Sequence, residues 1–343
     1  MRRITYRNII LVIIFSFFLT GCLKDKVNPF SSFVTSDTID MLTYLESNGD
    51  IINSRSTLSA FVNAQDLYSN LSNYVILDIR DPQLFSDGHI SGAINIQSSD
   101  LLTKVKSSGS SNVILVSQNG QSASYYGGLL RLDGLSNVYI LEFGMAGWNS
   151  HFASQWEYYN GLITTGNKYF NNVFYERGPY TSLPEVKLNT SGDIKDKIEQ
   201  RIQDLLSQKF DDIVTLQSTF ELSVLPENVF SAGIFSITDS TFGDQYIACY
   251  DTFFTYAVAL HDVRPPMHAP HSVLYTYYND LGSAYYLQTI PSNKKVVMYS
   301  KSGHQSAFAT AYLRLLGYNA RSMLFGATWL SPFPGSMNYP YVN

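Results

Sequence analysis

Cysteine and charge are both scarce in this 343-residue sequence. It holds two cysteines, Cys22 and Cys249, and 15% of its residues are charged. Two cysteines exclude a disulfide framework and the zinc motifs that need paired cysteines. The net charge of −5 gives no reason to expect nucleic-acid binding. With 45% hydrophobic residues, the composition is that of a globular protein, and the length suits two ordinary domains.

Long hydrophobic runs are also missing near the N-terminus, where residues 9–19 form an apolar stretch too short for a comfortable membrane span. Arginines before this stretch and small residues after it predict a secretory signal. Residues 19–22, Leu-Thr-Gly-Cys, resemble a bacterial lipobox. The resemblance implies cleavage before Cys22 and acylation of that residue, with an ordinary signal peptide as the alternative. Several acyl chains would anchor the protein to a membrane, and Leu23 implies the outer membrane by analogy with Gram-negative sorting.

One stretch occurs twice, at residues 113–132 and 296–317, and each copy has the pattern of a buried strand, a tight loop and a helix. A glycine follows the first loop position by three residues, where a chain turning into a helix often needs no Cβ. Loop amides and a helix N-terminus then point into one bowl, which suits an anion. The bowl positions are Ser117, Gln118, Asn119, Gly120, Gln121 and Ser122 in the first copy, and Ser300, Lys301, Ser302, Gly303, His304, Gln305 and Ser306 in the second.

Three further segments surround the first copy. Residues 75–81 end a strand in Asp-x-Arg, residues 88–96 read Gly-His-Ile-Ser-Gly-Ala-Ile-Asn-Ile, and residues 144–148 end in Trp148. In this order, the four segments resemble the rhodanese family of sulfurtransferases, whose active-site loop is Cys-x-x-Gly-x-x-Ser. The resemblance implies an α/β fold with two tandem rhodanese-like domains, each a parallel sheet with helices on both faces. It also implies that Asp78, Arg80 and His89 hold the surrounding loops and that Trp148 caps the core.

The family's nucleophile is a cysteine that carries sulfane sulfur as a persulfide, and here Ser117 and Ser300 stand at its position. A helix N-terminus lowers a thiol pKa, whereas a serine hydroxyl titrates far higher and does not take part in thiol exchange. A serine nucleophile needs an adjacent base. His304 is the candidate in the second loop, but we expect it to be a solvent-exposed loop residue. We therefore expect no sulfurtransferase activity.

Two other kinds of chemistry are disfavoured. A cysteine-dependent phosphatase needs an arginine six residues after its nucleophile, and Ala123 and Ser306 stand there instead. Metal binding could draw on Cys249 and a histidine group, but the spacings fit no compact zinc motif, so we expect separate histidines, no metal and no cofactor. That group is His261, His268, His271 and His304.

Strands and helices are predicted to alternate, which favours a parallel sheet covered on both faces. Strands are expected at 75–79, 94–96, 113–116, 138–141 and 246–250, and helices from Asp37 as N-cap and at 59–68, 82–85, 101–106, 122–132 and 192–209. The layout is a signal peptide at 1–22, a tether and helix at 23–55, domain 1 at 56–157, a linker at 158–189, a degenerate domain 2 at 190–330 and a tail at 331–343. Cys249 falls where Asp78 falls, so domain 2 lacks the Asp-x-Arg pair.

The expected function is that of a lipid-anchored cell-envelope protein that has lost sulfurtransferase chemistry and binds a small anion or an envelope protein through its loops. One alternative is an active sulfurtransferase that uses Cys249 as the sulfur carrier. Another is a structural or interaction module of the envelope.

Overall fold

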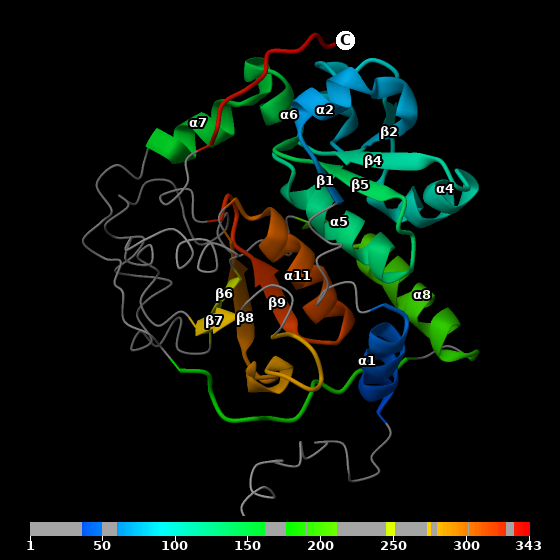
Figure 1. Cartoon of the computed structure of the whole chain (residues 1–343), viewed down its shortest axis with the longest axis vertical. Helices are drawn as coiled ribbons and strands as arrows, with labels where there is room; N and C mark the ends of the chain where they lie inside the picture. Colours follow the sequence, from blue (N-terminus) through cyan, green and yellow to red (C-terminus); the bar gives the residue numbers. More distant parts are fainter. Residues whose placement is uncertain are drawn as a thin grey trace, which may run out of the picture. The chain divides into compact units, whose positions relative to one another are not determined.

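The computed structural model describes residues 36–49, 60–161, 176–188, 191–210, 245–250, 273–275, 280–300, 302–326 and 333–343. All of them belong to one compact unit that runs from Thr35 to Asn343. Two parallel sheets form its framework (Figure 1). Within the described ranges, no helix combines the length and apolar character that crossing a bilayer requires. The predicted signal and Cys22 lie outside these ranges.

The first sheet has the strand order β1-β5-β4-β2-β3, and every pairing is parallel. Its strands are β1 (Phe61–Val62), β2 (Tyr74–Asp78), β3 (Ile94–Asn95), β4 (Asn112–Val116) and β5 (Val138–Leu141). The helices between and after them are α2 (Ala64–Ser69), α3 (Pro82–Ser86), α4 (Leu101–Ser107), α5 (Gln121–Leu132), α6 (Gly144–Trp148) and α7 (Ser154–Gly161).

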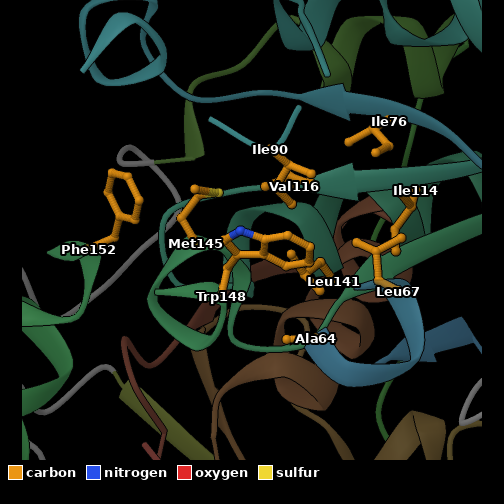
Figure 2. Packing of buried hydrophobic residues seen from close by; sticks show 10 residues of the cluster. All are labelled: Ala64, Leu67, Ile76, Ile90, Ile114, Val116, Leu141, Met145, Trp148 and Phe152. Carbon is orange, nitrogen blue, oxygen red and sulfur yellow. The ribbon is translucent and has the colours of Figure 1, made fainter. Parts of the chain in front are cut away.

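Helices cover both faces of the first sheet, as predicted. Ile114 and Val116 of β4 belong to a core cluster with Leu67 of α2 and Trp148 of α6 (Figure 2). Leu115 points to the other face, because successive side chains of a strand alternate. There it approaches α5, where a Cβ built on Gly127 would lie 3.6 Å from the Leu115 side chain.

The second sheet has the order β7-β6-β8-β9, again with parallel pairings only. It comprises β6 (Gln245–Tyr250), β7 (Val273–Tyr275), β8 (Lys295–Tyr299) and β9 (Asn319–Ser322), with α11 (His304–Leu315) after β8. This order repeats β3-β2-β4-β5 of the first sheet. Cys249 pairs with Tyr299 as Asp78 pairs with Val116, and both partners directly precede a loop serine. The register therefore confirms that Cys249 falls at the position of Asp78.

Helices α5 and α11 lie side by side between the two sheets (Figure 1). Their contact is close at Gly128, where an added Cβ would meet the Ala311 Cβ at 3.2 Å and the Phe308 ring at 3.3 Å. Helix α8 (Ile194–Leu206) contacts both of them, and it buries Ile198 and Ile202.

The N-cap of α1 and the start of α2 differ from their predictions. Ser36, not Asp37, is the N-cap of α1 (Asp37–Ser47), because its Oγ accepts a hydrogen bond from the Ile39 amide. The helix predicted at 59–68 begins only at Ala64, after the N-cap Asn63. Phe61 and Val62 instead form β1, where pairing with β5 at the sheet edge overrides the local helical pattern.

Candidate functional site

The two repeated loops have the same backbone. Each ends in a glycine with positive φ, Gly120 at 84° and Gly303 at 81°, that caps the following helix. A Cβ on Gly120 would lie 2.6 Å from the His304 Nε2, and one on Gly303 would lie 2.8 Å from the Gln121 side chain. Glycine is needed at both positions because the backbone is left-handed and because a side chain from the opposite loop approaches it closely.

The serine at the family's nucleophile position fills its own bowl in each loop. Ser117 Oγ accepts hydrogen bonds from the amides of Gly120 (3.1 Å) and Ala123 (3.3 Å). Ser300 Oγ accepts one from the Ser306 amide (3.2 Å) and pairs with the Ser306 hydroxyl (3.2 Å). Both serines are 1% exposed. The amides expected to hold an anion therefore point at buried hydroxyl oxygens.

A two-residue segment after the neighbouring strand clamps each loop. Phe143 and Gly144 have φ values of 60° and 55°, and Phe325 and Gly326 have 59° and 55°. A side chain on Gly144 would collide with the Ser117 carbonyl, and one on Gly326 with the Ser300 carbonyl. The Ser117 carbonyl accepts a hydrogen bond from the Met145 amide at 2.9 Å. The repeated Phe-Gly pair is a sequence signal for the second clamp that motif matching missed.

Gln121, the first residue of α5, crosses from the first loop to the end of β9. Its Nε2 donates to the Ser322 hydroxyl and to the Met323 carbonyl, both at 2.7 Å. Its Oε1 accepts from the Phe325 amide at 3.0 Å. The side chain is completely buried. These three hydrogen bonds tie the first loop to the end of β9 and the residues after it.

His304, the first residue of α11, crosses in the opposite direction. Its Nε2 donates to the Asn119 carbonyl at 2.9 Å, so its Nδ1 is the acceptor for the Ser302 hydroxyl at 2.8 Å. The ring lies near those of Phe61, Phe143 and Trp156. The expectation of a solvent-exposed loop residue is wrong, because His304 is 2% exposed.

Burial makes His304 a neutral imidazole. Loss of solvation lowers its pKa below the ordinary 6.5, against the opposing effects of the Glu142 charge and the hydrogen bond to Asn119. Its ring nitrogens are bonded to Ser302 and Asn119, while Ser300 pairs with Ser306. This arrangement does not form the nucleophile–base pair that a serine-dependent reaction needs.

The Asp-x-Arg pair is structural, as the resemblance implied. Arg80 Nη2 lies 2.7 Å from Asp78 Oδ2 and 2.7 Å from the Gly88 carbonyl, and both charged side chains are buried. The Arg80 Nη1 also reaches Gln118 Oε1 at 3.4 Å. The backbone amide and carbonyl of His89 both form hydrogen bonds with Val342, near the C-terminal end of the described residues. Trp148 is 1% exposed and caps the core, as expected.

The other predicted bowl positions support the loops. Asn119 Oδ1 accepts from the Gln121 amide at 3.0 Å, and Gln118 Nε2 donates to the Phe152 carbonyl at 2.9 Å. Ser122 and Gln305 are half-buried. Lys301 and three of the candidate histidines, His261, His268 and His271, lie outside the described residues. Among the residues that are described, no group of three histidine, cysteine or acidic side chains could hold a metal ion.

Comparison with known proteins matches most of the first sheet and its loop to one protein family. Residues 63–151 match a family model described as a rhodanese-like domain. The thiosulfate sulfurtransferase GlpE of Ectopseudomonas mendocina (strain ymp) is 36% identical over 93 residues, which are 27% of this chain and 84% of that protein. GlpE of Pseudomonas entomophila (strain L48) is 29% identical over 82 residues, covering 24% of this chain and 75% of the relative.

Two solved structures of rhodanese-type proteins align with the chain over different lengths. The rhodanese-related protein of Thermoplasma volcanium aligns with 27% of this chain and 90% of its own, at 28% identity and a TM-score of 0.24. SseA of Escherichia coli, described as a 3-mercaptopyruvate sulfotransferase with the rhodanese fold, aligns with 78% of this chain and 98% of its own, at 16% identity and a TM-score of 0.27.

Proposed function

The chain belongs to the rhodanese family of sulfurtransferases, and we propose that it is a non-catalytic member, because Ser117 and Ser300 replace the family's cysteine. In this proposal the chain contains two rhodanese-like domains whose loops hold each other, and neither loop carries sulfur. It serves as a binding or structural module at the cell envelope, attached to the outer membrane through lipid on Cys22.

The loss of sulfur transfer rests on one observation, the position of the Ser117 hydroxyl. Its oxygen takes the Gly120 and Ala123 amides, the donors that would otherwise stabilise a thiolate or an anion. An alcohol does not form a persulfide by thiol–disulfide exchange. Because Ser117 is only 1% exposed, thiosulfate would not reach its oxygen unless the two loops separated.

The tandem arrangement is supported by the repeated strand order, the paired left-handed glycines and the paired Phe-Gly clamps. These features recur at matching positions in the two sheets, although the second sheet keeps few of the family's sequence motifs. A duplicated domain accounts for all of them together.

The contacts between the two loops limit what can bind at either bowl. Gln121 and His304 fill the space above the opposite loops, so anion or partner binding at a bowl requires the loops to part. The closed geometry therefore favours an interaction or structural role that uses other surfaces. Isothermal titration with thiosulfate, sulfate and phosphate separates the two: measurable heat would favour binding at the bowls.

The experiment that tests the proposal is a thiosulfate:cyanide sulfur-transfer assay on the wild-type chain, with a GlpE-type enzyme as the positive control. We expect no turnover above the uncatalysed rate. Turnover that survives Cys249→Ala would overturn the interpretation of both loops.

The alternative is a sulfurtransferase that uses Cys249. The register favours it in one respect: Cys249 pairs with Tyr299, the residue directly before the Ser300 loop. Turnover that Cys249→Ala and Cys249→Ser both abolish would establish this alternative in place of the proposal.

The membrane anchor has its own test. Mass spectrometry of the mature N-terminus from membrane fractions should find an acylated Cys22. An unmodified N-terminus in the soluble fraction would refute the anchor and leave the loop chemistry unaffected.

A further inference from the structure

The last eleven residues lie, without helix or strand, along residues 60–161, the first unit, which is built on the first sheet (Figure 1). Gly335 and Asn338 turn the backbone with positive φ, at 96° and 56°, and Tyr339 and Tyr341 follow these turns. The Met337 amide donates to the Gly147 carbonyl and the Tyr339 amide to the Trp148 carbonyl, both at 3.0 Å. Val342 and His89 exchange two backbone hydrogen bonds, at 2.8 and 2.9 Å, as an antiparallel bridge. The segment is thus held through its backbone, much as a peptide ligand is held at the edge of a sheet.

Side chains of the first unit also form hydrogen bonds with the backbone of this segment. The indole Nε1 of Trp148 donates to the Pro340 carbonyl at 2.9 Å, and Asn149 Nδ2 donates to the Tyr339 carbonyl at 2.8 Å. In return, Asn338 Oδ1 accepts from the Ser150 amide at 3.1 Å. These three hydrogen bonds join residues 148–150 to residues 338–340, so the two segments match over three consecutive residues.

Tyr339 occupies the first of two aromatic pockets. Its ring stacks on Tyr68, with centroids 4.1 Å apart and planes 9° apart, and it lies 5.2 Å from Trp148. It packs against the core cluster of Figure 2. A ring stack of this kind contributes about 0.5–1.5 kcal/mol beyond the area that the rings bury.

Tyr341 occupies the second pocket. Its ring stacks on His151 at 5.4 Å and meets the edge of Phe152 at 5.0 Å. It also lies flat against Gly88, where an added Cβ would come within 2.6 Å of the ring. Residues two apart in an extended chain point to the same side, so Tyr339 and Tyr341 enter neighbouring pockets together.

We propose that Tyr68, Gly88, Trp148, His151 and Phe152 form a peptide-binding groove for an extended segment with two tyrosines two residues apart. Its intramolecular ligand is the chain's own segment 333–343, and its intermolecular ligand is the same segment of a second copy. A second copy is the occupant because its segment carries every contact described above. The groove lies apart from the two loops, so the proposal holds whether or not the loops transfer sulfur.

The intramolecular ligand has a large concentration advantage. A tethered segment has an effective concentration on the order of millimolar. A free peptide that binds with micromolar affinity is therefore excluded from the wild-type groove. Copies exchange segments only when they are crowded to a comparable concentration or when their own segment is released.

The first experiment uses the full chain with Tyr339→Ala and Tyr341→Ala, which empties both pockets and leaves the groove intact. A fluorescent peptide of residues 333–343 should bind this variant at least ten times more tightly than it binds wild type. The matched control replaces Tyr180 and Tyr285, two exposed tyrosines elsewhere, and should behave like wild type. A peptide with both tyrosines replaced should bind at least ten times more weakly.

A released segment can be obtained in a second way if the double variant does not fold. Val342→Pro removes the amide that donates to the His89 carbonyl and should also admit the peptide. Failure of the peptide to bind every folded variant would overturn the groove. Equal binding to wild type would overturn its occupation by the chain's own segment.

The second experiment tests the second copy as the occupant. The Tyr339→Ala/Tyr341→Ala chain, with an open groove, is mixed with a full chain carrying Tyr68→Ala and His151→Ala, whose segment is intact and whose groove is impaired. Light scattering should show a one-to-one complex in the mixture and monomers in each sample alone. A mixture that stays monomeric at concentrations where the peptide binds would overturn exchange between copies.

Discussion

Gln121 and His304 occupy the same position in the two loop–helix repeats, and each forms hydrogen bonds with the part of the chain that contains the other. Each is the first residue of the helix after a loop, and each lies against the glycine of the opposite loop. Gln121 makes three hydrogen bonds across the contact, and His304 makes one, to the Asn119 carbonyl. The positions that would approach a substrate in a catalytic loop here fasten the two loops together.

Gln121→Leu should lower the free energy of unfolding by about 2 kcal/mol, because it leaves the Phe325 amide buried without its acceptor and leaves the Met323 carbonyl with the Gly326 amide alone. Thermal unfolding followed by circular dichroism measures the change. Gln65→Leu, at an exposed position of α2, is the matched control and should change stability by less than about 0.5 kcal/mol. Equal midpoints for the two variants would show that Gln121 does not fasten the loops.

Stability should fall as the pH falls below 6.5, because burial lowers the pKa of His304. Above 6.5 the imidazole is neutral in both the folded and the unfolded chain. Below 6.5 the unfolded chain binds a proton that the folded chain does not, so the free energy of unfolding decreases until the pH reaches the lowered pKa.

The measurement compares thermal midpoints at pH 7.5 and pH 5.5. His304→Gln should reduce the difference between them. An identical pH dependence in wild type and His304→Gln would contradict the assignment of this effect to His304.

Gly144→Ala should destabilise the protein far more than Gly134→Ala. Both glycines have positive φ, at 55° and 93°, so an alanine costs about 1 kcal/mol of backbone strain at either site. Nothing lies within 4 Å of a Cβ on Gly134, whereas a Cβ on Gly144 meets the Ser117 carbonyl and lies 2.8 Å from the Gly120 amide. We expect an additional loss of at least about 2 kcal/mol at Gly144; similar unfolding midpoints would mean that the clamp is loose.

Ser117→Cys and Ser300→Cys should each yield a thiol with a pKa below that of free cysteine, because loop amides point at the side-chain atom. The thiol should nevertheless react slowly, since both positions are 1% exposed. Alkylation against pH, followed by mass spectrometry in a Cys249→Ala background, gives both quantities.

Removing the His304 ring, which lies against Gly120 of the first loop, tests whether this ring shields the thiol. Adding His304→Ala to Ser117→Cys should speed alkylation at least tenfold. An exposed reference, Ser86→Cys, should be unaffected by His304→Ala. If Ser117→Cys already reacted as fast as this reference, the loop would be open to solvent.

Much of the fold could be predicted from the sequence because its elements depend on local pattern. The strand at Val138–Leu141 has the predicted bounds, and α5 starts one residue before its predicted start. The positive φ of Gly120 and Gly303 follows from the same local logic. The alignment of Cys249 with Asp78 held because two strands of similar pattern precede two similar loops.

The contents of the site could not be predicted in the same way, because they depend on contacts between distant residues. Gln121 meets Ser322 across 201 positions of the sequence, and Trp148 meets Pro340 across 192. His304 looked like an exposed loop residue because nothing near it in the sequence indicates the rings of Phe61, Phe143 and Trp156. The strand at Phe61–Val62 was missed for the same reason: its partner, β5, lies almost eighty residues later.

Segment 333–343 packs on residues that are synthesised much earlier. The ribosome makes the first unit early, and domains generally fold as they emerge, N-terminal ones first. Yet the rings that cover Tyr68, Trp148 and Phe152 belong to Tyr339 and Tyr341. Until Tyr339 and Tyr341 leave the ribosome, the nascent chain presents Tyr68, Trp148 and Phe152 without the rings that pack against them in the folded protein.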